Sequence, residues 1–137
     1  MNFIHWRITF SYMLFMALLS HVPQDDLPSN STLEFNNIDY FFHLIEYTVL
    51  GFLLYRSFDE DESFSISPII GSIIIGIIFA ITDELHQAFV PGRNMSFADL
   101  CFNFIGVNIG LFVSFQKKLN GGSFFQLRPD HCVFLLL

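Results

Sequence analysis

The stretch "TDELHQAFVPGR", residues 82–93, contains four ionisable side chains: Asp83, Glu84, His86 and Arg93. It directly follows "SPIIGSIIIGIIFAI", residues 67–81, which contains none. A helix that crosses a bilayer needs about 20 mostly apolar residues, and the Pro-Gly pair at 91–92 is a strong turn signal. The two stretches together therefore predict a transmembrane helix that ends in a polar cluster and a turn.

The composition of the whole chain also favours a membrane. The chain has 137 residues, which fits one domain, and is 53% hydrophobic with 19 phenylalanines and 14% charged residues. A soluble domain has about 25% charged residues, so this chain has too little polar surface for water. The net charge of −7 excludes nucleic acid as a partner, since phosphate contacts need clustered Lys and Arg. Cys101 and Cys132 suggest neither a disulfide scaffold nor a cysteine-rich metal site.

Four segments are long and apolar enough to be transmembrane helices: 6–22, 39–58, 67–87 and 97–115. We therefore predict an all-α membrane protein, a bundle of four transmembrane helices, in one domain over 1–116 with a short cytoplasmic tail over 117–137. The first segment also fits a signal peptide, with Arg7 before an apolar stretch. No small-x-small cleavage site precedes "HVPQDD", which favours a retained anchor.

The distribution of basic residues predicts the orientation, because cytoplasmic loops are enriched in Lys and Arg. With the N-terminus inside, only Arg93 lies outside, and both chain ends are cytoplasmic. The acidic run "DEDE", residues 59–62, is then interpreted as a solvated cytoplasmic loop. The basic residues assigned to the inside are Arg7, Arg56, Lys117, Lys118 and Arg128.

In this topology all four segments bring polar residues to the outer end of the bundle. Ionisable residues within a span are costly and usually face a bundle interior or a cavity, so we predict a shared polar pocket. Glu46 lies deepest, and we expect it to face inward and to pair with a group at the end of the third segment. The converging residues are Ser20, His21, Asp39, His43, Glu46, Tyr47, Thr82, Asp83, Glu84, His86, Gln87, Asp99 and Asn103.

The turn and the fourth segment add three local expectations. Ser96 can cap the fourth helix, with Asp99 three residues later as a partial capping box. Arg93 can pair with Asp83, Glu84 or Asp99, or it can bind a phosphate or carboxylate through two parallel hydrogen bonds. The GxxxG spacing in "GVNIG", residues 106–110, permits close helix packing in lipid.

Two stretches resemble the VanZ-like family of small bacterial membrane proteins: "DYFFHLIEYTVLGFLL" and "TDELHQAFVPGRNMSFADLCFNFIGVNIG". Relatives commonly have a lysine where this chain has Tyr40. The family is named for a member associated with low-level resistance to the glycopeptide teicoplanin, so the resemblance implies a place in the bacterial cell envelope rather than a particular reaction. Its characteristic positions fall on His43, Tyr47, Asp83, Glu84, His86, Gln87, Phe89, Pro91, Gly92, Arg93, Asp99, Asn103 and Gly106.

Three functions remain open. The first is a binding or transport-like module in the bacterial cytoplasmic membrane, whose pocket faces outside and meets the headgroup of a membrane lipid or lipid-linked envelope precursor. Its binding residues would be Tyr47, Gln87, Arg93, Asp99 and Asn103.

The second function is a membrane-embedded hydrolase or transferase with candidate catalytic residues His43, Glu46, Asp83, Glu84 and His86. Either histidine could act as a general base, or the group could hold a divalent metal. No spacing matches a zinc helix such as His-Glu-x-x-His, so we predict no metal site and leave the cofactor open. The third function is a structural partner subunit, with self-association through helix packing.

Overall fold

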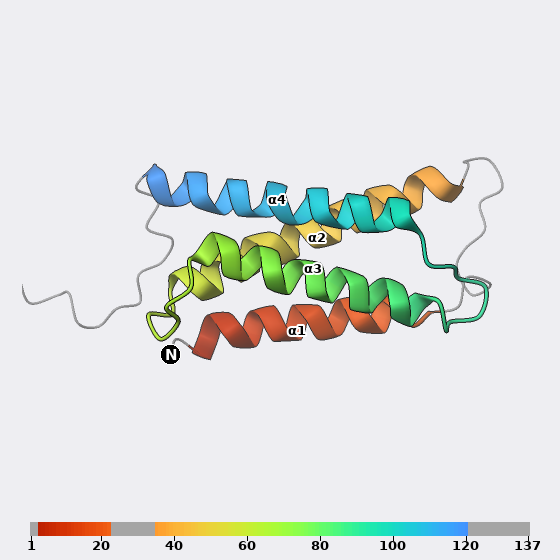
Figure 1. Cartoon of the computed structure of the whole chain (residues 1–137), viewed down its shortest axis with the longest axis horizontal. Helices are drawn as coiled ribbons and strands as arrows, with labels where there is room; N and C mark the ends of the chain where they lie inside the picture. Colours follow the sequence, from red (N-terminus) through yellow and green to blue (C-terminus); the bar gives the residue numbers. More distant parts are fainter. Residues whose placement is uncertain (1–2, 23–34, 121–137) are drawn as a thin grey trace, which may run out of the picture.

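The fold consists of four helices in a computed structural model that describes residues 3–22 and 35–120. Figure 1 shows the helices lying side by side along the long axis of the molecule. The prediction of an all-helical chain with four helices is confirmed, with shifted ends: α2 begins before Asp39, and α4 continues past residue 116. The remainder of the predicted tail, 121–137, lies outside the described residues. The helices are α1 Phe3–Ser20, α2 Phe35–Asp59, α3 Pro68–Gln87 and α4 Phe97–Leu119.

The ends of α3 and α4 follow from local sequence. Pro68 lies in the first turn of α3. Backbone N–H groups there have no partner within the helix, so the N–H that proline lacks costs no hydrogen bond. Gly92 has a φ of 78°, which an L side chain rarely adopts, so it allows the sharp turn after α3. Ser96 caps α4 as predicted, because its Oγ accepts a hydrogen bond from the Asp99 N–H at 3.3 Å.

α2 and α4 pack backbone against backbone through glycines. A Cβ on Gly110 would lie 2.0 Å from the Thr48 carbonyl oxygen, and one on Gly51 would lie 2.3 Å from that of Val107. A Cβ on Gly106 would likewise lie 2.6 Å from the Leu44 oxygen. The predicted close packing is thus present, and the surface that the GxxxG residues contact is α2 of the same chain.

The bundle is apolar outside and partly polar inside. Its buried centre includes Met16, Leu50 and Val107, but also hydroxyl groups. One hydroxyl pair, Thr9 and Ser57 at 2.8 Å, joins α1 to α2. All four helices expose large apolar side chains, among them Ile8, Leu14, Phe41, Phe42, Ile70, Ile78, Phe104 and Phe112. Of the described helices, α3 and α4 are long and apolar enough to cross a membrane by length and composition alone.

At the end of the bundle opposite the predicted polar pocket, the Asp61 side chain makes hydrogen bonds to α1 and to its own loop. This carboxylate is 2% exposed and accepts hydrogen bonds from the Trp6 indole at 2.9 Å, the Ser63 hydroxyl and the Ser63 N–H. These hydrogen bonds, above all that of the Ser63 hydroxyl, hold the pKa of Asp61 below its ordinary value. The interpretation of residues 59–62 as a solvated loop is therefore wrong for Asp61, because its carboxylate connects the start of α1 to the α2–α3 loop.

Candidate polar site

The predicted convergence of polar residues is present at one end of the bundle. The helices alternate in direction, so the ends of α1 and α3 lie beside the starts of α2 and α4 (Figure 1). We call the side chains gathered there the polar site. It comprises buried Ser20, His43, Tyr47, Asp83, Glu84, Gln87, Asp99 and Asn103, half-buried Asp39, Glu46 and Arg93, and exposed His21 and His86.

Glu84, near the end of α3, caps the start of α4. Its Oε2 accepts a hydrogen bond from the Ser96 N–H at 3.1 Å. In a capping box this N–H would go to the acidic residue three positions later, which is Asp99. Because Glu84 takes that role, the Asp99 carboxylate does not close the predicted capping box.

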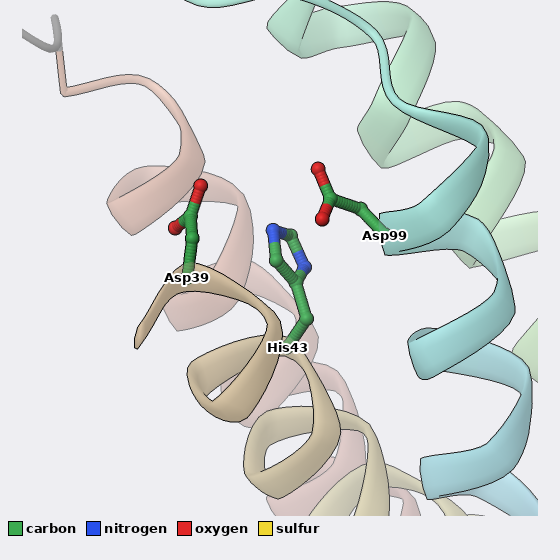
Figure 2. A group of neighbouring side chains, drawn as sticks. All are labelled: Asp39, His43 and Asp99. Atoms are coloured by element: carbon green, nitrogen blue, oxygen red, sulfur yellow. The ribbon is translucent and has the colours of Figure 1, made fainter. Parts of the chain in front are cut away.

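The side chain of Asp99 lies instead beside His43. Figure 2 shows His43, from α2, between Asp39 of the same helix and Asp99 of α4. One donor atom from each of the three residues lies within 4.8 Å of the others. Asp39 and His43 are one helical turn apart and so share a face of α2. Sequence reasoning placed Asp39 on that face but did not include it in the catalytic or binding set.

Six buried side-chain atoms among the described residues have no hydrogen-bond partner, and all six belong to the polar site. Native proteins satisfy the large majority of such atoms, so a cluster of exceptions needs an explanation. The atoms are His43 Nδ1, Glu84 Oε1, Arg93 Nε, Asp99 Oδ1, and both Oδ1 and Nδ2 of Asn103.

Arg93 is not ion-paired with any residue that the structure describes. The internal pair with Asp83, Glu84 or Asp99, one of the two expectations for this residue, is not formed. The guanidinium is half-buried, and its charge acts on the Asp99 and Glu46 carboxylates from a distance. Its buried Nε has no hydrogen-bond partner among the described residues.

Other predicted site residues are fixed by contacts between helices. The Tyr47 hydroxyl donates to Asp83 Oδ2 at 3.3 Å, which joins α2 to α3. The Gln87 amide donates to the Ser20 hydroxyl at 3.5 Å, which joins α3 to α1. Tyr47 is fully buried, so its hydroxyl orients Asp83 from within the bundle.

Glu46 and His86 differ from what the sequence predicted. The Glu46 side chain is half-buried, and in the described parts of the chain it makes no hydrogen bond or ion pair with the end of α3. His86 is exposed, with its Nε2 at 3.2 Å from His21 Nδ1 and the two rings stacked at 5.3 Å. His86 therefore contacts α1. Of the histidines in the described residues, only His43 lies beside buried carboxylates.

An apolar groove runs along the seam between α3 and α4, with a volume of about 430 Å³. Ala80 in its wall lies three residues before Asp83, and Leu100 directly follows Asp99. The groove therefore lies between the two helices that carry Asp83 and Asp99. Its walls include Gly76, Ala80, Ile81, Leu100, Cys101 and Phe104.

Comparison with known proteins identifies one family. Residues 2–118 match the VanZ/LLP1 family, which covers all four helices nearly to the end of α4. No curated protein and no solved structure matches the chain.

Proposed function

The chain belongs to the VanZ/LLP1 family, and from this premise we propose that all four helices cross a membrane and that the polar site binds the headgroup of a lipid. The lipid is a membrane lipid or a lipid-linked cell-envelope precursor. The observation that carries this proposal is the cluster of six buried, unpartnered polar atoms.

The apolar exterior supports the four-span arrangement. Every helix exposes large apolar residues, such as Leu14 on α1 at 62% and Phe42 on α2 at 55%. A soluble monomer rarely exposes so extensive an apolar surface to water, whereas a membrane protein exposes such a surface to lipid.

The charge distribution supports a site on the outer face of a bacterial cytoplasmic membrane. Arg7, Arg56, Lys117 and Lys118 lie at the end of the bundle away from the polar site, and Arg93 lies at the polar site. Cytoplasmic ends carry the excess of Lys and Arg. The polar site accordingly faces outside, where envelope precursors are used.

The charges of the site indicate the chemistry of the headgroup. Arg93 presents a planar guanidinium, which suits a phosphate. Asp39, Glu84 and Asp99 accept hydrogen bonds, so they suit hydroxyl or ammonium donors. A headgroup with both features, a phosphate bearing an amine or a sugar, satisfies the site better than a simple anion.

The α3–α4 groove supports an amphiphile rather than a free headgroup. Its walls are apolar and come from α3 and α4, the two helices that carry Asp83 and Asp99. An acyl or isoprenoid chain lying in the groove would place its own headgroup at the polar site. We therefore assign the groove to the hydrocarbon chain of the same lipid.

A second candidate function is a membrane-embedded hydrolase or transferase. It is favoured by the position of His43 between two carboxylates, since an imidazole with a carboxylate partner can act as a general base. Catalysis would act on the bound lipid, so the binding experiment comes first.

The test is lipid binding by the protein in nanodiscs or detergent, measured by native mass spectrometry. We expect phosphatidylethanolamine to bind more tightly than phosphatidylcholine, and Arg93→Lys to weaken it about tenfold, because the ammonium cannot form two parallel hydrogen bonds. Arg56→Lys at the other end is the matched control. Inorganic phosphate binding as tightly as the lipid would assign the site to a free anion, and equal binding by Arg93→Lys and the parent would contradict the proposal.

A further inference from the structure

We propose that Asp39, His43 and Asp99 bind a divalent transition-metal ion. This inference goes beyond the proposed function and does not depend on it, because a metal can bind this group in the absence of lipid. It rests on the geometry of the three side chains and on two buried atoms that have no partner.

The three side chains meet from two helices. Figure 2 shows the imidazole of His43 between the two aspartate carboxylates, with Asp99 reaching toward it from the first turn of α4. Their donor atoms lie within 4.8 Å of one another. Metal–ligand distances of about 2.0–2.2 Å place two ligands of one ion up to about 4.4 Å apart, so small rotations of the side chains complete the group.

The second observation is the pair of unpartnered atoms. His43 and Asp99 are 4% and 5% exposed, and His43 Nδ1 and Asp99 Oδ1 have no hydrogen-bond partner among the residues that the structure describes. A charged His43 bridging the two aspartates would be the simplest alternative to a metal. No ion pair within the described residues joins His43 to either carboxylate.

Neighbouring residues prepare the group for a metal. Glu84 accepts the Ser96 N–H in place of Asp99, and Asp99 Oδ1 has no hydrogen-bond partner among the described residues. Asn103, one turn further along α4, is fully buried and offers an amide oxygen without a partner. Packing of α4 on α2 through Gly106 fixes the distance between the helices that supply the ligands.

The donor set indicates the class of ion. One imidazole nitrogen with carboxylate oxygens suits Zn²⁺ or Mn²⁺ better than Ca²⁺ or Mg²⁺, which prefer oxygen alone. Three protein ligands leave coordination positions open, as in metal sites that bind a ligand or water. The ion would also offset the excess of carboxylates beside Arg93.

The experiment is zinc titration of the full chain in detergent, by calorimetry and by metal analysis after gel filtration. The parent for this test carries His21→Gln and His86→Gln, because that exposed pair can bind zinc by itself. We expect one zinc per chain, and Asp39→Asn, His43→Gln and Asp99→Asn should each weaken its affinity by more than about 100-fold. Asp59→Asn is the matched control, a half-buried aspartate at the other end of the bundle that is bound to Lys118, and should keep the affinity.

Folding of each variant is checked by its thermal midpoint without metal. Asp39 is half-buried near the start of α2. Asp39→Asn therefore still tests the metal site if the substitutions at buried His43 and Asp99 prevent folding. Saturating zinc should raise the midpoint of the parent and leave that of Asp39→Asn unchanged. Zinc binding that is absent from the parent, or equal in the parent and Asp39→Asn, would overturn the proposal.

Discussion

At the scale of single residues, the site depends on which acid caps α4. Asp99 stands at the position of a capping-box acid, yet the Ser96 N–H is bound by Glu84 from another helix. The exchange joins the end of α3 to the start of α4, and the Asp99 side chain lies beside His43. Asp99, which the sequence explains as a capping residue, is therefore part of the polar site.

We predict that Glu84→Ala lowers the free energy of unfolding by about 1–2 kcal/mol, because the N-cap N–H of α4 loses its acceptor. Glu84→Gln should cost less, since its amide oxygen can still accept this hydrogen bond. The measurement is equilibrium unfolding in detergent, with Glu60→Ala as the control. Glu60 forms an exposed ion pair with Arg56, which is expected to contribute under about 1 kcal/mol. Equal losses in Glu84→Ala and Glu60→Ala would contradict this role.

At the scale of helices, the sequence predicts where elements begin and end better than what they contact. Four helical segments, a Pro-Gly turn and the Ser96 cap are predicted from local signals, and all three are confirmed as local structure. Contacts between distant residues leave no such signal. The pairing of His86 with His21 depends on how α1 sits beside α3, and nothing in either segment specifies it.

The same limit explains the two electrostatic expectations that failed. Proximity of Arg93 to several carboxylates in sequence favoured an ion pair, but within the described residues its guanidinium forms none. Asp61 was assigned to water because it stands in an acidic run. The partner that buries it, Trp6, lies 55 residues earlier in the chain.

At the scale of the whole molecule, polar and basic groups are sorted to opposite ends of the bundle. In the described residues the polar site includes one basic side chain, Arg93, while Lys117 and Lys118 end α4 at the other side. Apolar side chains cover the surface between the ends. This arrangement predicts both a transmembrane orientation and a site that is kept for a ligand.

The orientation is tested by single cysteines in a chain lacking Cys101 and Cys132. Asn94→Cys, in the exposed turn between α3 and α4, should react with an impermeant maleimide on intact cells. Glu62→Cys, in the α2–α3 loop, should react only after the membrane is permeabilised. The reverse pattern would place the polar site in the cytoplasmic leaflet.

The central claim is that the unpartnered polar atoms serve a ligand rather than the fold. Asn103 tests it most directly, since it is fully buried and, within the described part of the chain, neither of its amide atoms has a hydrogen-bond partner. Leucine has the same branched arrangement of side-chain heavy atoms, so Asn103→Leu removes the buried polar atoms without leaving a cavity, which should raise the free energy of unfolding by about 1–2 kcal/mol. The same variant should bind phosphatidylethanolamine at least about tenfold more weakly. A less stable Asn103→Leu protein with unchanged lipid binding would show that Asn103 serves the fold, and would contradict the account.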